Sequence, residues 1–434
     1  MSDRKICIFE DEKYGNLYPI ALTHPVFELK CGHTFLYEKI IRNFNNAKAV
    51  YFVREYLVSL VKKKIGNVSV TEGNGVTIND SNSLKGNDVL FINGRWVFMN
   101  YDLQLDGDEE IGIDKDGTII YARLNRNIVE GFTGTDISQF LKNSKDKIKN
   151  IKTINVAVVN YLWDLVKFNP EAIKDDFKHL KETGIKGKFA KSSEVFGDNN
   201  LVFVAKTAQV HPQVVLDTTL GPVIIDEGAI VYPFTRIEGP SCIGRNTFIV
   251  GAKIREGSAI GETCRIGGEV EESIVHGFSN KYHEGFLGHA YLGEWVNLGA
   301  STQNSDVKND YSNVQMYVND TLMDSGMTKL GCMVGDHTKT AIGTLINTGT
   351  VVGTMSNVVG GGDMLPKFIP SFCWYLNGRP TKGYGFNQMI ESAKRVLERR
   401  KKTLTEDDIL ILKKAYEIAK IKRDELIKKS FMVR

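Results

Sequence analysis

The sequence predicts an amino-terminal α/β domain, then a left-handed parallel β-helix made of hexapeptide repeats, and finally carboxy-terminal helices. Three observations predict this order. Short apolar strands alternate with a helical pattern near the start, apolar residues recur every six positions from about residue 201 to 359, and helical spacing returns after residue 383. We expect an α/β domain at 1–155, a helical connector at 156–200, the β-helix at 201–384 and terminal helices at 385–434.

The α/β prediction rests on three segments. Lys5 to Phe9 and Ala49 to Val53 are short apolar runs typical of buried strands, and Leu36 to Phe44 between them has helical spacing. Ala157 to Leu180 also has helical spacing, and we expect Pro170 to interrupt it because proline lacks the amide hydrogen that a helix interior needs.

The six-residue period predicts a coil with three flat faces, in which an aliphatic residue points inward and a small residue four places later turns the corner. The aliphatic series is Ile225, Val231, Ile237, Ile243 and Ile249, followed after a one-residue slip by Ile254, Ile260 and Ile266. The small residues are Ala229, Thr235, Ser241, Thr247, Ser258 and Cys264. Neither helical nor simple strand alternation explains this pattern.

The period returns twice further along the chain. It is found at Phe286, Leu292 and Leu298, and again at Val334, Thr340, Ile346, Val352 and Val358, with Thr338, Thr344, Thr350 and Ser356 in the small position. The polar stretch from Gly299 to Leu330 breaks the period, so we expect it to leave the solenoid as a loop, where function is often found.

After Gly383 the chain is predicted to be helical. Asn387 to Arg400 forms one amphipathic segment, and Thr405 with Asp408 resembles a capping box before a second segment that runs to about Lys429. We expect these helices to cover another part of the protein and their lysine-rich face to be solvated.

Composition narrows the class of protein. The 434 residues contain 55 basic and 52 acidic side chains, a net charge of +3 that gives no support to a nucleic-acid or membrane surface. No run of about eighteen apolar residues occurs, so a cytoplasmic protein is expected. The six cysteines lie far apart without a CxxC pair, and we expect them to be reduced and buried.

A cluster of histidines marks a candidate site. His276, His283 and His289 fall within fourteen residues, and histidine is the side chain best suited to take a proton at neutral pH. Considered singly, each of them is more often structural than catalytic.

The segment NKYHEGFLGHAYLGEWVNLGASTQNSD, Asn280 to Asp306, resembles the acetyltransferase signature of the bifunctional bacterial N-acetylglucosamine-1-phosphate uridyltransferase and glucosamine-1-phosphate acetyltransferase family. The resemblance implies His283 as catalytic base, Asn297 beside the acetyl group, Phe286 near the sugar phosphate and Ala300 at acetyl-coenzyme A. Arg255, in IREG, resembles an arginine that holds the sugar phosphate.

The sequence departs from the family at two places. Where the family has a lysine for the sugar phosphate, this chain has the acidic run Glu269 to Ser273, and Asp336 stands where the family has a serine at the coenzyme. Either the acceptor is a different amino sugar, or Lys281 holds the phosphate instead.

The opening ICIFEDEKYGNLYPIALTHPVFELKCG and the segment FINGRWVF, Phe91 to Phe98, resemble an alternative bacterial branch of the same family. Its amino-terminal domain is a divergent, Rossmann-like sugar-1-phosphate nucleotidyltransferase. The ordinary family's glycine-rich loop with GTRM is missing here, and Gly15 is a weak substitute.

Nucleotidyl transfer needs a magnesium ion on one or two carboxylates and cations along the phosphates. Glu10, Asp11 and Glu12 follow the first predicted strand, and we expect Asp11 and Glu12 to hold Mg²⁺. Lys30 and Arg95 are the candidates for phosphate contact. The alternative is that the acidic run is a solvated turn in a domain that binds without catalysis.

These features favour a transferase of nucleotide-sugar synthesis that uses acetyl-coenzyme A and Mg²⁺ on small-molecule substrates. The β-helix would acetylate a hexosamine-1-phosphate, and the first domain would join the product to a nucleotide, with UTP the expected donor. One alternative keeps nucleotidyl transfer only, with the β-helix as a trimer scaffold. Another is a non-catalytic sugar-nucleotide sensor or platform. The resemblance also implies a homotrimer.

Overall fold

The computed structural model describes residues 4–44, 49–66 and 76–432, and within them the chain forms two compact units. The first contains residues up to 17 together with 23–29 and 34–160. The second contains residues 18–22, 30–33 and everything from 161 onward. No helix among the described residues has the length and apolar content needed to cross a membrane.

The first unit is a seven-stranded mixed sheet in the order β3-β2-β1-β4-β6-β5-β7. Strands β1, β2, β3 and β4 are parallel, and β6 runs antiparallel to β4 and β5. The strands are β1 Lys5–Phe9, β2 Ala49–Phe52, β3 Thr77–Ile78, β4 Val89–Asn93, β5 Glu110–Ile113, β6 Ile119–Leu124 and β7 Ile151–Thr153. The helices are α1 Leu36–Arg42, α2 Val58–Ile65, α3 Arg126–Val129 and α4 Ile137–Ser144. The predicted α/β domain is therefore confirmed.

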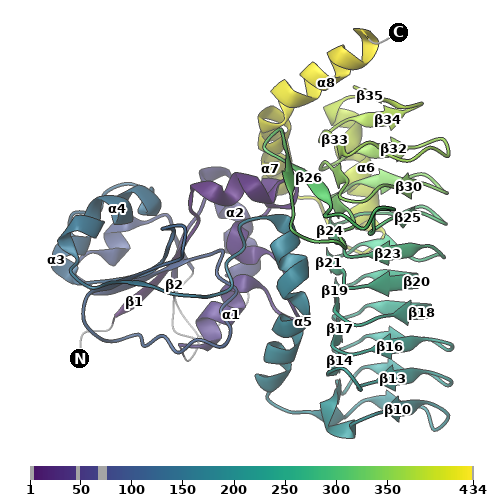
Figure 1. Ribbon diagram of the computed structural model, residues 1–434, viewed down its shortest axis with the longest axis horizontal. Coiled ribbons are helices and arrows are strands. Elements are labelled where there is room, and N and C mark those ends of the chain that lie inside the picture. The colour runs from purple at the N-terminus through teal and green to yellow at the C-terminus, as the bar shows by residue number, and fades with distance from the viewer. Residues whose placement is uncertain (1–3, 45–48, 67–75, 433–434) are drawn as a thin grey trace. The chain divides into compact units, whose positions relative to one another are not determined.

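The second unit contains a parallel β-solenoid with three ladders, whose strands are stacked one above another in Figure 1. The first ladder has ten strands, namely β8 Gly184–Ile185, β11 Val202–Val204, β14 Val223–Ile225, β17 Ser241–Ile243, β19 Ser258–Glu262, β21 Ile274–Gly277, β24 Tyr291–Glu294, β28 Met333–Val334, β31 Val351–Val352 and β33 Phe368–Ile369. The solenoid thus begins at Gly184, before the predicted residue 201.

The long strands β18 Phe248–Ile254 and β20 Arg265–Glu271 take part in both other ladders. The second ladder also contains β9 Lys188–Phe189, β12 Gln209–Val210, β15 Ile230–Val231, β22 Asn280–Lys281, β29 Lys339–Thr340, β32 Asn357–Val359 and β34 Trp374–Leu376, with β35 Arg379–Thr381 antiparallel at its end. The third also contains β10 Glu194–Phe196, β13 Val215–Asp217, β16 Arg236–Glu238, β23 Phe286–Gly288, β25 Gln303–Asn304 and β30 Leu345–Ile346.

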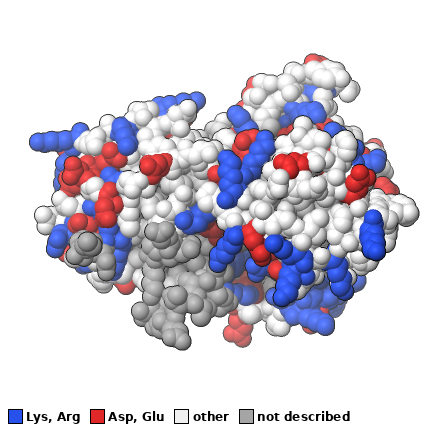
Figure 2. Space-filling view, turned by 90° about the horizontal axis from the view of Figure 1, so that it is seen from below, with Lys and Arg blue, Asp and Glu red and all other residues white. Residues whose placement is uncertain are grey.

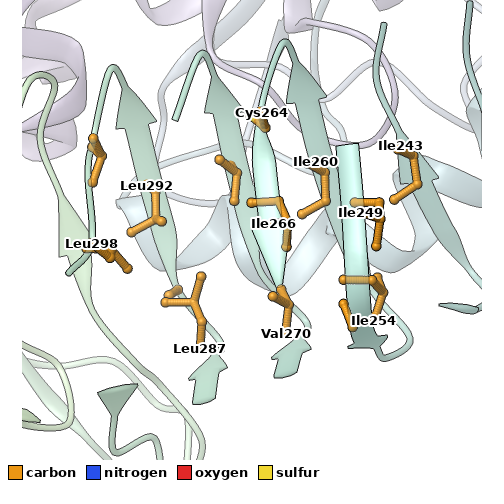
Figure 3. Packing of buried hydrophobic residues seen from close by; sticks show 14 of the residues in the cluster. Ile243, Ile249, Ile254, Ile260, Cys264, Ile266, Val270, Leu287, Leu292 and Leu298 are labelled. Atoms are coloured by element: carbon orange, nitrogen blue, oxygen red, sulfur yellow. The ribbon is translucent and has the colours of Figure 1, made fainter. Parts of the chain in front are cut away.

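The predicted aliphatic anchors fill the solenoid interior. The eight anchors from Ile225 to Ile266 have no exposed surface, and Figure 3 shows several of them lying between the strands. Burial of one such side chain contributes about 1.5–3 kcal/mol. The small residues are buried as well, and their hydroxyls bond the next coil: Thr247 Oγ1 donates to Gly261 O at 2.8 Å, and Thr338 Oγ1 to Gly353 O at 2.7 Å.

The prediction that Phe286 is an inward anchor is wrong. Phe286 is half-buried, and its neighbour Leu287 lies in the core instead. Leu287 follows the inward Lys281 by the usual six residues, but the next inward residue, Leu292, comes only five residues later, so a period of six counted back from Leu292 falls on Phe286, which faces outward.

The break in the period is an ordered hairpin. Strands β26 Gln315–Val318 and β27 Thr321–Asp324 pair antiparallel, whereas Gln303 and Asn304, which we placed in the loop, still belong to the solenoid ladder. The excursion therefore starts later than predicted.

Helix α5, Leu162–Lys178, continues through Pro170, so the predicted interruption is wrong. Buried residues on both sides of Pro170 hold the helix in place. In addition, the Asn169 side chain donates to Gly257 O at 2.7 Å and accepts from Gly32 N at 2.6 Å. This tertiary anchoring offsets the single backbone hydrogen bond that proline removes.

The terminal helices α6 Phe386–Glu398, α7 Glu406–Ile418 and α8 Lys420–Met432 belong to the second unit. The capping box at Thr405 and Asp408 is confirmed. The predicted second segment is two helices, because α7 ends at Ile418 and α8 begins at Lys420.

The terminal helices cover one corner of the solenoid. Phe278, Trp295, His337, Met355 and Phe372 each follow an inward residue of the first ladder by three positions, and each has a positive φ between 53° and 60°. A large side chain seldom adopts this backbone conformation. Four of them pack in or against an apolar cluster with residues of α6 and α7, which compensates for the strain.

All six cysteines are free and buried, as predicted. The face of the molecule in Figure 2 carries lysine and arginine together with aspartate and glutamate, in keeping with the near balance of charge in the sequence.

Candidate functional site

The acidic run at the end of β1 is held by basic side chains of the first unit. Asp11 is buried, and both of its carboxylate oxygens accept hydrogen bonds from the fully buried Arg95, one of them from Nε at 2.8 Å. Asn93 Nδ2 adds a hydrogen bond to Asp11 at 2.9 Å. Arg95 Nη1 donates to Val159 O and Asn160 Oδ1, at 2.8 and 2.9 Å.

Glu10 and Glu12 have basic partners of their own. Arg54 donates to both oxygens of Glu10, at 2.9 and 3.0 Å, and Glu12 accepts from Lys142 Nζ at 2.5 Å and from Ser138 Oγ at 2.6 Å. Partial burial by itself would raise the pKa of Glu12, but these hydrogen bonds outweigh it and lower the pKa to about 2. Glu12 is thus ionised throughout the neutral range.

These pairings bear on magnesium binding. Carboxylate oxygens are the donors that Mg²⁺ prefers, so the chemistry of the run suits the ion. Asp11 would have to release a buried guanidinium to bind it, whereas Glu12 is exposed and would release a surface lysine and the Ser138 hydroxyl. Of the two predicted ligands, Glu12 is therefore the one whose surroundings fit a metal.

The two predicted phosphate ligands of the first domain do not fall in the same unit. Arg95 belongs to the first, whereas Lys30 clusters with the second. Lys30 is buried, its ammonium donates to His33 O at 2.6 Å, and its backbone amide donates to Tyr291 Oη at 3.0 Å.

Four predicted residues of the solenoid lie around one corner, in two consecutive coils. His283 is exposed in the corner between β22 and β23, and Ala300 lies in the same corner of the next coil, where Ser301 N donates to Glu284 O at 3.0 Å. Asn297 lies just before the corner that contains Ala300, and its side-chain oxygen accepts a hydrogen bond from Asn280 Nδ2 at 2.8 Å. Phe286 lies just after the corner that contains His283. This corner therefore carries an exposed histidine together with an amide and an aromatic side chain.

Arg255 is held by the acidic run that replaces the family's lysine. Its guanidinium donates to Glu271 at 2.8 Å, and Lys329, from the base of the hairpin, lies 3.3 Å from the other oxygen of the same carboxylate. Glu271 thus brings two cations to one place. Lys329 was missed because it lies 58 positions after Glu271, beyond most of the expelled segment.

The predicted residues Lys281 and Asp336 are buried. The ammonium of Lys281 donates to Gly267 O at 2.8 Å and to His283 O at 3.2 Å, and burial lowers its pKa to about 8. Asp336 accepts from the backbone amide of Glu294 at 2.8 Å. Lys281 would have to leave two carbonyls to reach a phosphate.

His289 is the centre of a second charged group. It is buried, its Nδ1 lies 2.8 Å from Asp306 and its Nε2 lies 3.5 Å from Glu272. Burial by itself would lower the pKa of His289, but the hydrogen bonds and charges of these two carboxylates raise it to about 9. His289 is therefore a cation at neutral pH. Ligand atoms of Glu271, Glu272 and His289 lie within 4.8 Å of one another.

Together, these two units define a protein with an α/β sheet and a parallel solenoid, each carrying polar candidate sites. Residues 6–184 match the sugar nucleotidyl transferase family. A bifunctional sugar-1-phosphate nucleotidylyltransferase/acetyltransferase of Sulfurisphaera tokodaii is 32% identical over 174 residues, which are 38% of this chain and 41% of the relative.

A second relative aligns over most of its length. The bifunctional protein GlmU of Methanococcus vannielii is 24% identical over 398 residues, 81% of this chain and 92% of that protein. The chain spans less than half of the length of several other relatives, such as 44% of the GlmU protein of Synechococcus elongatus. The resemblance to this group, inferred from the sequence, is confirmed.

A solved structure, the UDP-N-acetylglucosamine acyltransferase of Francisella novicida, aligns with 58% of this chain and 90% of its own. The TM-score is 0.26 at 12% identity, too low to support a structural comparison.

Proposed function

We propose that this protein is a bifunctional enzyme of nucleotide-sugar synthesis. Its solenoid transfers an acetyl group to a hexosamine-1-phosphate, and its first domain transfers a nucleotidyl group from UTP to the product with release of pyrophosphate. The observation that carries the proposal is the pairing of a sugar nucleotidyl transferase match at residues 6–184 with a GlmU relative aligned over 92% of its own length.

The acetylation is assigned to the corner that bears His283. Acetyl-coenzyme A supplies the acetyl group as a thioester when it is bound. His283 takes the proton that the amine loses as its nitrogen bonds to the acetyl carbon, and the carbon–sulfur bond breaks with release of coenzyme A. Asn297 orients the acetyl group, Phe286 contacts the sugar, and Arg255 meets the sugar phosphate.

The nucleotidyl transfer is assigned to the end of β1. Magnesium supplies positive charge to the triphosphate when it is bound, and Glu12 is the side chain that would hold it. Arg95 and Asp11 act together as a rigid support beneath this position, because their charges neutralise each other in the interior.

The remaining parts of the proposal come from resemblance. We place the reaction in the cytoplasm and expect a homotrimer in which the coenzyme lies between solenoids, with Ala300 and Asp336 on the coenzyme side.

Two product assays on the full chain test the proposal. The first measures coenzyme A released from acetyl-coenzyme A with glucosamine-1-phosphate. The second measures pyrophosphate released from UTP with N-acetylglucosamine-1-phosphate and Mg²⁺. We expect both products, and absence of both with any hexosamine phosphate would refute the proposal.

Substitutions assign each reaction to its unit. His283→Ala should reduce coenzyme A release by about 10²–10⁴-fold, the usual contribution of a general base, and leave pyrophosphate release unchanged. Glu12→Gln should do the reverse. His211→Ala, a partly exposed histidine elsewhere on the solenoid, is the matched control and should change neither.

One observation favours a second candidate, nucleotidyl transfer with the solenoid as a scaffold. Arg255 is bonded to Glu271, and Lys281 is bonded to two carbonyls, so neither predicted phosphate ligand has a free head group. Pyrophosphate release without any coenzyme A release would establish this alternative.

A further inference from the structure

A polar cavity lies between the solenoid and helix α6. Its volume is about 70 Å³, room for about five water molecules or one phosphate-sized group. Lys339, Asn357 and Trp374 are consecutive neighbours in the second ladder and line one side. The other lining residues are His337 and Met355 at the covered corner, Tyr384 before α6, and Gln388, Met389 and Ser392 on α6.

Lys339 brings a positive charge that the protein itself leaves largely unmatched. Within the described residues its ammonium makes one hydrogen bond, to His337 O at 2.8 Å, and has no carboxylate within ion-pair distance. Burial lowers the pKa of Lys339 to about 8. A half-buried ammonium with two unused protons favours a ligand that accepts them.

His337 adds a second incomplete group. It is 7% exposed, and among the described residues its buried Nδ1 has no hydrogen-bond partner. Burial, together with the charge of Lys339, lowers the pKa of His337 to about 4 despite the opposing charges of Asp336, Glu294 and Asp408. The imidazole is therefore neutral and can donate one hydrogen bond to a ligand without adding charge.

The start of helix α6 adds a further preference for negative charge. The helix has thirteen residues, and its N-cap, Gly385, has no side chain to bond the first free amides. Tyr384 and Gln388, on either side of that first turn, both line the cavity. Helix amino termini attract anions through these free amides and the helix dipole.

The donors in this cavity outnumber its acceptors. Lys339, Asn357, Gln388, the indole N–H of Trp374 and the hydroxyl of Tyr384 can all donate, whereas no carboxylate is among the lining residues. The set suits neither a metal cation nor an apolar ligand, and its size suits a tetrahedral oxyanion.

From this arrangement we infer that the cavity between Lys339 and helix α6 is a binding site for a phosphate group. Lys339 holds the group by charge, with Asn357 and Gln388 as neutral donors. Trp374 and Tyr384, whose rings are 5.0 Å apart in an edge-on arrangement, flank the opening and would contact whatever the phosphate is attached to. The inference does not depend on the proposed function.

The test is calorimetric titration of the full chain with inorganic phosphate. We expect saturable binding at one site per chain, and Lys339→Met, which keeps the length of the side chain, should weaken it by about tenfold or more. The matched control is Lys253→Met, because Lys253 is a lysine of the same solenoid whose side chain is 73% exposed. It should bind as the unchanged protein does.

A second variant guards against misfolding of Lys339→Met. Gln388 is exposed on α6, so Gln388→Glu should fold normally, as circular dichroism can verify, and should weaken phosphate binding by adding a negative charge at the opening. The inference would be overturned if the unchanged protein showed no saturable phosphate binding. It would also be overturned if folded Lys339→Met and Gln388→Glu both bound phosphate as tightly as the unchanged protein does.

The source of the phosphate is decided by two further titrants, UDP and coenzyme A. If the affinity of either falls in Lys339→Met as that of inorganic phosphate does, that compound is the source. If neither depends on Lys339 while inorganic phosphate does, the ligand is free phosphate.

Discussion

The pairing of Asp11 with Arg95 makes a prediction that separates a structural carboxylate from a metal ligand. In Asp11→Asn the shape of the side chain is kept, but Arg95, which has no exposed surface, loses its countercharge. The amide nitrogen of asparagine would also face a guanidinium nitrogen, so one hydrogen bond becomes a contact between two donors.

Loss of one partner of a buried ion pair costs about 3–5 kcal/mol, because the remaining charge is left uncompensated. In Asp11→Asn the cost should lie at the lower end of this range, because Val159 O and Asn160 Oδ1 still accept hydrogen bonds from Arg95. We therefore expect about 3 kcal/mol, equivalent to roughly a hundredfold increase in local opening.

Hydrogen exchange measured by mass spectrometry on β1 and β4, without Mg²⁺, is the appropriate assay, because a chain with two units need not unfold in one step. The matched control is Glu12→Gln, since the Glu12 side chain is 56% exposed and its ion pair is worth at most about 1 kcal/mol. Should Asp11→Asn exchange at the unchanged rate without Mg²⁺ and lose only a Mg²⁺-dependent protection, Asp11 would be a metal ligand and our reasoning would be wrong.

Three further predictions concern the solenoid. In the folded protein the pKa of His289 is about 9, against 6.5 for an unperturbed histidine, so protonated His289 contributes up to about 3 kcal/mol of stability below pH 6.5. This contribution is lost as the pH rises through 9, and His289→Gln should abolish the resulting pH dependence of stability. Denaturant melts at pH 6 and pH 9.5 measure it, and equal midpoints in the unchanged protein would contradict it. Phe372→Ala should cost about 3–5 kcal/mol and speed hydrogen exchange in α6 and α7, because Phe372 is 1% exposed. Phe234→Ala, at an uncovered corner with φ 61° and 77% exposure, should be nearly neutral in the same experiment. Gly261→Ala should lower the yield of folded protein and the melting temperature, because a Cβ there would lie 1.9 Å from His276 O of the next coil. A melting temperature within 2 °C of the parent, a shift of roughly 1 kcal/mol or less, would show that the coils can separate to admit it.

The predicted catalytic corner and the charged groups beside it differ in how far the sequence reveals them. His283, Asn297 and Ala300 could be placed near one another from the sequence. His283 lies in one coil and the other two lie in the next, and the repeat puts them at the same corner of the solenoid. The bond between Arg255 and Glu271 could not be foreseen. It depends on which outward residues of neighbouring coils face each other, and the one-residue slips alter that register.

The same slips explain the error at Phe286. A period of six predicts which residue points inward only while each corner has the same length. The corner after Lys281 has the usual length, but the step from Leu287 to Leu292 is five residues instead of six, so the series that contains Leu292 was extended back to Phe286 instead of Leu287.

The sequence marks the covered corner by the residue three positions after each inward residue, but this pattern can be recognised only once the structure shows which corner the terminal helices cover. Three positions after the inward residues Ile225, Ile243 and Ile260 the chain has Gly228, Asn246 and Thr263, whereas later coils have large apolar residues such as Trp295 and Phe372 at that position. The change from small to bulky marks the coils that the terminal helices cover.

The sequence by itself determined the solenoid, the α/β domain and the helical ends of this chain, because periodicity and capping act over a few residues and are written locally. Only the tertiary structure decided which charges are neutralised and which remain available. The pairing of Asp11 with Arg95 and the pairing of Glu271 with Arg255 and Lys329 join distant segments of the chain. Burial and charge depend on those long-range contacts, so no local pattern predicts them.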